Sequence, residues 1–136
     1  MEVQCALELI DVYLNNADQK DYFLACAVDE TDQPRGYVCY GPTPLTAGTY
    51  DLYWIAVDPA WHGRGAGSLL MEYVEHQVST TARARLLIIE TSSLPRYEAA
   101  RRLYSRHHYR EVARLPDFYA EGDDRVIYAK RLSEKL

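Results

Sequence analysis

A glycine-rich turn between an apolar strand and a helix constrains the fold of this chain more than any other segment. Residues 54–70 read WIAVDPAWHGRGAGSLL, and glycines stand at positions 63, 65 and 67. Alternating glycines let the backbone approach a ligand closely, and a helix that starts there directs the positive end of its dipole to the same place. Arg64 adds a permanently charged donor that suits phosphate. The segment predicts a site for phosphate oxygens, or otherwise a tight strand-to-helix connection.

Spacing separates the nucleotide-binding motifs to which such a turn could belong. A P-loop is excluded, because it requires Gly-Lys-Ser/Thr and no Lys follows these glycines. A Rossmann loop fits poorly, since Ser68 occupies the position of its third glycine and residues 58–61 separate the strand from the glycines. Glu90 does stand where a ribose-binding acid would be, so a nicotinamide-dependent dehydrogenase stays open as an alternative.

The segment resembles the acyl-CoA loop of the GNAT acetyltransferase superfamily, whose pattern is Gln/Arg-x-x-Gly-x-Gly/Ala. HGRGAG at 62–67 matches this pattern except that His62 replaces Gln or Arg, and the flanking WIAVDP and SLLM are similar to the family as well. The resemblance implies acetyl-CoA as cosubstrate, with pantetheine bound by backbone groups of the strand and pyrophosphate by the loop. The implied cofactor-binding residues are Ile55, Ala56 and Val57 in the strand and His62, Gly63, Arg64, Gly65, Ala66, Gly67 and Ser68 in the loop.

Hydrophobic periodicity predicts an α/β chain with one domain over residues 1–136. We expect helices at 3–15, from 66 onward and at 96–107, and strands at 22–28, 36–40, 49–57, 85–91, 109–114 and 126–130. The helix from residue 66 should bury the side that carries Ala66, Leu69, Leu70, Tyr73, Val74 and Gln77.

This order matches the GNAT layout, except that the first family strand is expected to be absent. The resemblance implies a mixed, mostly antiparallel sheet flanked by helices. In such a sheet the strands at 49–57 and 85–91 run parallel and splay apart for acyl-CoA. A missing first strand would expose a strand edge, which a second copy could cover in a homodimer.

Tyr104 is the candidate catalytic acid. AARRLYSRHHY at 99–109 resembles the family stretch in which a helix tyrosine precedes a Gly-Phe pair. The resemblance implies that Tyr104 protonates the departing CoA thiolate. His108 stands in place of the Gly, and His tolerates the positive φ that this helix exit requires. A tyrosine that only packs on the sheet is the alternative.

Glu90 is the candidate general base for the ammonium group of the acceptor. It follows an apolar strand near the proposed cleft, where burial would raise the pKa of its carboxyl. Asp51, Tyr53 and Asp117 are rivals for this role. Alternatively, the Glu90 carboxylate has a structural role, as a cap or as a partner in an ion pair, and a water molecule transfers the proton.

The loop at 117–124 is the candidate for substrate recognition, through Asp117, Phe118 and Tyr119. It would act as a lid or bind an amine, although acidic surface turns are common. We expect no metal site, because the adjacent His107 and His108 have no ligand partner at a recognisable spacing. The cysteines at 5, 26 and 39 are scattered in apolar stretches, which indicates buried reduced thiols.

Composition restricts the partners. The net charge of −5 argues against nucleic acid and suits an amine. A basic cluster at 96–110 is either a solvated face or a site for the ribose phosphate of CoA. The chain shows neither a signal peptide nor an apolar run long enough to span a membrane, so a cytoplasmic location is expected.

Together these features predict an N-acetyltransferase that moves an acetyl group from acetyl-CoA to a primary amine by direct attack in a ternary complex. No cysteine has the setting of a nucleophile, so an acetyl-cysteine intermediate is not expected. The alternative from another class is a non-catalytic acyl-CoA-binding or sensing domain. The groove that selects the acceptor is built from variable loops such as residues 41–48, so the identity of the acceptor is not predicted.

Overall fold

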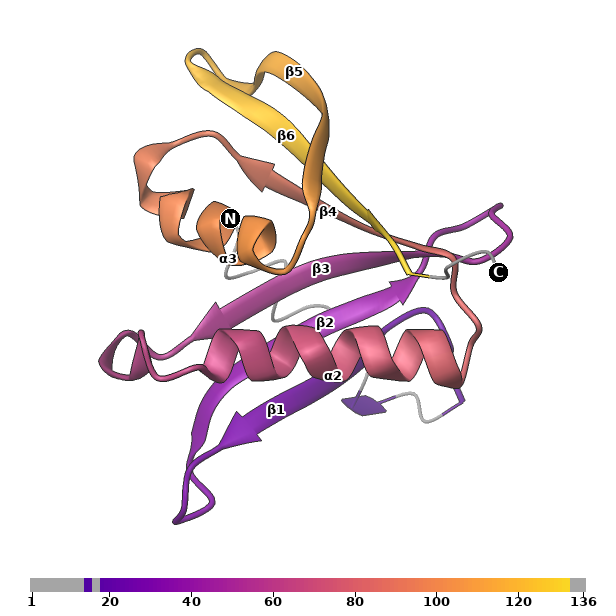
Figure 1. Ribbon diagram of the computed structural model, residues 1–136, viewed down its shortest axis with the longest axis vertical. Helices are drawn as coiled ribbons and strands as arrows, with labels where there is room; N and C mark the ends of the chain where they lie inside the picture. The colour runs from indigo at the N-terminus through magenta and orange to yellow at the C-terminus, as the bar shows by residue number, and fades with distance from the viewer. Residues whose placement is uncertain (1–13, 16–17, 133–136) are drawn as a thin grey trace.

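The computed structural model describes residues 14–15 and 18–132, which include a six-stranded mixed sheet (Figure 1). The elements are β1 (Phe23–Val28), β2 (Pro34–Pro42), β3 (Thr49–Val57), η1 (Pro59–Trp61), α2 (Ala66–Thr80), β4 (Leu86–Ser92), η2 (Pro95–Tyr97), α3 (Glu98–Arg106), β5 (Arg110–Ala120) and β6 (Asp123–Arg131). The helix predicted at 3–15 lies outside the described residues except at positions 14–15. The absence of a first family strand therefore stays a prediction.

The strand order is β1-β2-β3-β4-β6-β5. Within the described residues, β3 and β4 alone pair in parallel, because the crossover helix α2 returns the chain to the same end of the sheet before β4 begins. The other pairings among the described strands are antiparallel. The predicted mixed, mostly antiparallel sheet with a parallel pair at 49–57 and 85–91 is thus confirmed.

One hydrophobic core joins α2 and α3 to the sheet. It contains Leu52 of β3, Ile89 of β4, Val126 of β6 and Leu103 of α3. Figure 1 shows α2 lying across β1, β2 and β3. No helix in the described part of the chain is long and apolar enough to cross a membrane.

The predicted buried face of α2 is wrong in part. The helix buries Leu70, Met71, Val74 and Val78. Leu69 and Tyr73 are 60% and 43% exposed. Apolar residues cover more than one side of this helix, so periodicity allows several orientations, and the packing of α2 on the sheet selects one.

The prediction of buried thiols is wrong for one described cysteine. Cys39 of β2 is buried, whereas Cys26 of β1 is exposed, and both are free thiols. Neighbouring residues of a strand point to opposite faces, and the adjacent Ala27 occupies the core-facing position. Cys5 lies outside the described residues.

The predicted loop at 117–124 is mostly strand. β5 continues to Ala120, and β6 begins at Asp123, so a short turn remains at 121–122. Gly122 has a φ of 82°, which allows the chain to reverse there, and Asp117 has a φ of 55°. The register between β5 and β6 shifts between Leu115 and Ala120, and this irregularity accommodates Pro116 in an edge strand.

Candidate active site

The glycine turn leaves the start of α2 open. Gly63 and Gly65 have φ angles of 79° and 84°, and nothing lies within 4 Å of the position where either would carry a Cβ. Gly65 is the N-cap of α2, and no side chain caps the helix there. The first N–H groups of a helix have no partner within it, so the start of α2 presents donors that suit an anion.

Gly67 is needed for the close packing of α2 on α3 rather than for an unusual backbone conformation. A Cβ at this position would lie 3.1 Å from Cδ2 of Leu103 in α3. The first turn of α2 therefore approaches α3 more closely than a larger residue would allow. The alternating glycines thus have two physical roles, and the sequence pattern alone did not distinguish them.

His62, which replaces the Gln or Arg of the loop pattern, binds the protein's own backbone. Its Nε2 atom lies 3.0 Å from the carbonyl oxygen of Val57, at the end of β3. The imidazole thereby links the turn to the strand that precedes it. This contact occupies one ring nitrogen, so His62 acts here as a brace of the loop.

Arg35 connects the turn to the hairpin of β1 and β2. Its guanidinium pairs with Asp29 at 2.8 Å and with Asp58 at 3.1 Å. Asp58 in turn accepts the N–H of Ala60 at 3.0 Å and caps η1. The guanidinium groups of Arg35 and Arg64 lie 5.2 Å and 4.6 Å, respectively, from the centroid of the Trp61 ring.

Strands β3 and β4 part beside this turn. Their pairing ends at Leu52 and Ile89, although β3 continues to Val57 and β4 to Ser92. Figure 1 shows the two strands diverging beyond this point. Residues 54–57 keep their pairing with β2 but have no β4 partner. The predicted splaying is therefore confirmed, whereas binding of pantetheine by Ile55, Ala56 and Val57 stays a prediction.

Tyr104 lies on the helix side of the sheet. It is 5% exposed, and its ring makes edge contacts with Tyr128 at 5.7 Å and Tyr109 at 6.4 Å between centroids. Burial raises the pKa of its phenol, and the nearby Tyr128 adds to this effect. The phenol therefore stays protonated throughout the physiological range, as a proton donor requires.

Asp51 and Glu90 differ in their surroundings. Asp51 is half-buried and accepts a hydrogen bond of 2.7 Å from Thr43 Oγ1. Burial raises the pKa of its carboxyl, and the negative charge of Glu90 acts in the same direction. Glu90 is exposed and pairs with Arg125 of β6, so the expected burial of Glu90 is wrong. β6 supplies this partner across a strand pairing that the sequence pattern could not reveal.

The three candidate recognition residues separate into two groups. Asp117 Oδ1 accepts the N–H of Gly122 at 2.8 Å, so this carboxylate shapes the turn of the hairpin. The Phe118 ring lies 4.7 Å from the Arg125 guanidinium and 5.0 Å from the Tyr119 ring. Phe118 and Tyr119 thus extend the group formed by Glu90 and Arg125, whereas Asp117 serves the backbone.

The end of α3 has the expected left-handed exit at His108, whose φ is 71°. The preceding His107 contacts the glycine turn, since its Nε2 lies 2.9 Å from Ser68 Oγ. Sequence reasoning missed this pair, because 39 positions separate the two residues. No group of metal-binding side chains occurs in the described ranges 14–15 and 18–132.

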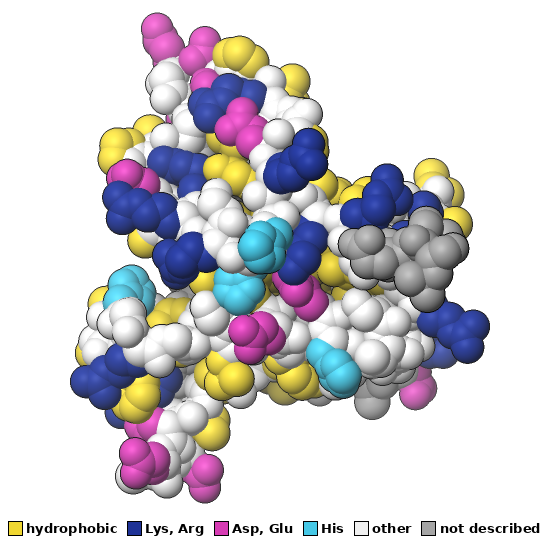
Figure 2. Space-filling view, viewed as in Figure 1, with side chains coloured by type: hydrophobic (Ala, Val, Ile, Leu, Met, Phe, Trp, Pro, Cys, Tyr) yellow, Lys and Arg dark blue, Asp and Glu magenta, His cyan; other side chains and the backbone are white. Residues whose placement is uncertain are grey.

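Two arginines of the basic cluster have structural partners. Arg101 donates to the backbone carbonyls of Ser92 at 2.6 Å and Leu94 at 3.0 Å. Arg102 pairs with Glu98 at 2.8 Å. Lys and Arg side chains gather over the half of the molecule that carries α3 and the β5–β6 hairpin (Figure 2). The structure therefore assigns Arg101 to holding the end of β4 on α3.

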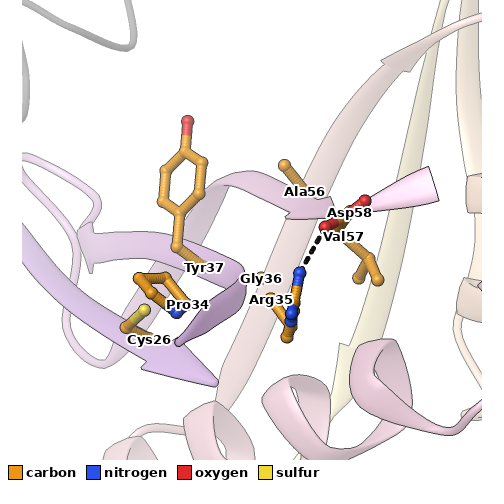
Figure 3. A pocket seen from close by; sticks show the side chains of 8 residues that line it. All are labelled: Cys26, Pro34, Arg35, Gly36, Tyr37, Ala56, Val57 and Asp58. Atoms are coloured by element: carbon orange, nitrogen blue, oxygen red, sulfur yellow. Dashed lines mark hydrogen bonds and ion pairs between the residues drawn. The ribbon is translucent and has the colours of Figure 1, made fainter. Parts of the chain in front are cut away.

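A hollow of about 450 Å³ lies over β1, β2 and the end of β3 (Figure 3). Tyr37 and Ala56 project to the same side of the sheet there, and the Arg35–Asp58 ion pair lies at its edge. No residue of β4 lines it. The hollow thus shares Ala56 and Val57 with the part of β3 that has separated from β4.

A mixed sheet that opens between its parallel strands beside a glycine turn defines an enzyme of the acetyltransferase class. The model of the acetyltransferase (GNAT) domain matches residues 19–111. The chain belongs to the GNAT acetyltransferase family. No curated protein sequence matches it significantly.

Solved structures agree with this assignment. A protein from Desulfovibrio desulfuricans assigned to the GNAT acetyltransferases is 42% identical, with a TM-score of 0.89 over 96% of this chain and 80% of that one. An aminoglycoside 6'-N-acetyltransferase complexed with coenzyme A is 14% identical, with a TM-score of 0.74 over 94% and 90%. The ribosomal-protein-S18-alanine N-acetyltransferase of Escherichia coli is 18% identical, with a TM-score of 0.73 over 90% and 77%. The last two likenesses concern the fold alone.

Proposed function

We propose that this protein transfers an acetyl group from acetyl-CoA to a primary amine, by direct attack within a ternary complex. The observation that carries the proposal is the end of β3–β4 pairing at Leu52 and Ile89, which leaves the last residues of β3 without a β4 partner before the chain enters a turn with an open helix start. The described strands form one sheet, and β1, β2, β3, β4 and β6 share one core with both helices. This supports treating residues 1–136 as a single acetyltransferase domain.

The cofactor fits the groups that this part of the chain presents. The uncapped start of α2 and the guanidinium of Arg64 would hold the pyrophosphate. Backbone groups of Ile55, Ala56 and Val57 that face away from β2 would hold pantetheine. An N–H of this strand would stabilise the oxygen that becomes anionic when the amine attacks the thioester, which is the acyl donor that acetyl-CoA supplies.

Proton transfer is divided between the two sides of the sheet. Tyr104, on the helix side, would donate a proton to the leaving thiolate. Ile89 faces the core, so its neighbour Glu90 faces the other side, where Asp51 is electrostatically coupled to it. Asp51 is the better base of the two, because its carboxyl is half-buried and has a raised pKa. Phe118 and Tyr119 would form part of the acceptor surface.

Calorimetric titration with acetyl-CoA, with NADH and ATP as controls, tests the cofactor. Release of CoA is then followed with a panel of a monoamine, a polyamine, an aminoglycoside, an amino acid and a peptide N-terminus. We expect binding of acetyl-CoA alone and transfer to at least one amine. Binding without transfer to any amine would favour an acyl-CoA sensing domain, and no binding by folded protein would contradict the proposal.

The acid role is tested with Tyr104→Phe. Loss of the phenolic proton should lower kcat roughly 10²-fold with little change in acetyl-CoA affinity. Tyr73→Phe is the matched control, because Tyr73 lies 43% exposed on α2. Unchanged turnover of Tyr104→Phe would exclude Tyr104 as the acid.

A further inference from the structure

His107 joins the end of α3 to the first turn of α2. It is the C-cap of α3, and its Nε2 lies 2.9 Å from the hydroxyl oxygen of Ser68, the third residue of α2. Figure 2 shows histidine side chains on this face, where the half carrying α3 meets the half carrying α2. Either tautomer of His107 can make this hydrogen bond, because the serine hydroxyl both donates and accepts.

A second contact fixes the same two helix ends. Leu103 of α3 lies against Gly67, where a Cβ would come within 3.1 Å of Leu103 Cδ2. Leu103 precedes His107 by four residues, which places both on one side of the helix end. The two contacts therefore form a continuous strip between α3 and the glycine turn.

Tyr104 is tied to the same strip through the backbone. Its carbonyl oxygen accepts the N–H of His107 at 3.1 Å and that of Tyr109 at 3.0 Å. A displacement of His107 would therefore shift the last turn of α3, on which Tyr104 is carried. The same displacement would release the Ser68 hydroxyl at the start of α2.

We propose that His107 is a positioning residue that couples the glycine turn to Tyr104. This inference rests on the proposed function. Ser68 lies among the first N–H donors of α2, so the position of its helix turn sets where a bound phosphate lies. Tyr104 must meet the thiol end of the same ligand. By holding Ser68, His107 keeps a fixed distance between the two, and small misplacements of reacting groups lower rates severalfold to a hundredfold.

The test is a set of double-mutant cycles. His107→Ala should lower kcat about tenfold and weaken acetyl-CoA binding severalfold, as expected for the loss of one hydrogen bond. Adding Ser68→Ala to His107→Ala should cause no further loss, because both changes remove the same bond. In the Tyr104→Phe background, His107→Ala should leave kcat unchanged, since the group that it positions is gone. His107→Gln, which can still reach Ser68, should recover most of the activity.

The matched control is His76→Ala, an exposed histidine of α2 away from the turn. Additive effects of His107→Ala and Ser68→Ala on acetyl-CoA affinity would overturn the coupling, as would an equal loss of kcat with and without Tyr104. If His107→Ala does not fold, Ser68→Ala removes the same hydrogen bond from the other side, and an unchanged kcat and acetyl-CoA affinity of Ser68→Ala would overturn the coupling. Binding of acetyl-CoA without transfer to any amine would contradict the proposed function, whereas the affinity cycle would still decide the coupling.

Discussion

The hydroxyl of Thr43 donates a hydrogen bond of 2.7 Å to the carboxylate of Asp51, just before β3 leaves β4. This contact orients a carboxyl group whose pKa burial raises, despite the opposing effect of the hydrogen bond itself. The structure thus favours Asp51 of β3 over Glu90 as the general base. The distinction can be tested with single substitutions.

We expect Asp51→Asn to lower kcat/KM by roughly 10²-fold, the usual contribution of a general base. Its thermal stability at pH 7 should be no lower than that of the parent protein, because the folded state disfavours the charged form of a carboxyl with a raised pKa. Turnover and thermal unfolding of one preparation measure both effects. Glu121→Gln, at the exposed hairpin turn, controls for the loss of one negative charge. Normal turnover of Asp51→Asn would remove Asp51 from the mechanism.

Glu90→Gln should keep most of the activity but move the acidic limb of the pH–rate profile to lower pH. The charge of Glu90 raises the pKa of Asp51, and Arg125 lowers it. Removing Glu90 takes away the first effect and releases Arg125, so both changes lower the pKa of the base. The profile of kcat/KM against pH measures this shift. Loss of activity at every pH would instead indicate that Glu90 is the base.

Gly65→Ala should weaken acetyl-CoA binding by about tenfold. Alanine at a φ of 84° costs about 1–2 kcal/mol, and the turn would relax away from the shape that exposes the start of α2. Gly122→Ala is the matched control, because Gly122 has a φ of 82° and equally open surroundings in the distant hairpin. Calorimetry should show weaker binding only for Gly65→Ala. Equal affinities of the two variants would argue against a role of the turn in binding.

Asp29→Asn should lower the melting temperature at pH 7 by a few degrees. The hydrogen bond from Thr31, then that from Gln33, and the pairing with Arg35 lower the pKa of Asp29 below its ordinary value of 3.8. A depressed folded pKa stabilises the protein above the unfolded pKa of about 3.8, and this contribution declines below that pH and is lost as the pH falls through the depressed folded pKa. The difference between variant and parent should therefore shrink in acid.

Asp32→Asn is the control for this stability prediction, because it lies in the same turn with a φ of 62° that asparagine tolerates. Its melting temperature should match that of the parent at each pH. A difference for Asp29→Asn that stays constant down to the lowest pH at which the parent protein remains folded would show that its charge is not responsible.

Much of the fold follows from short-range patterns. The glycines at 63, 65 and 67 predicted a strand, an open turn and a helix, and the structure has β3, the turn and α2 there. His108 takes the positive φ expected of it. These features depend on backbone preferences and on periodicities of a few residues, so neighbouring residues determine them.

Other features were misjudged because local patterns do not carry them. The exposed Cys26 and the orientation of α2 depend on which face each element turns to the core. The segment 117–124 contains Pro and Gly, so it suggested a loop, yet pairing with β6 keeps most of it in a strand. Tertiary packing thereby overrode the local turn signal.

The sequence by itself determined the family, the order of the elements, the glycine turn and the place of Tyr104 on a helix. Only the tertiary structure decided where β3 and β4 part, that Glu90 pairs with Arg125 while Asp51 is half-buried, and that His107 meets Ser68. The reason is physical. The positions of turns and helices depend on neighbouring residues. The burial of a side chain and the pKa of its ionisable group depend on contacts between segments that lie far apart in the chain.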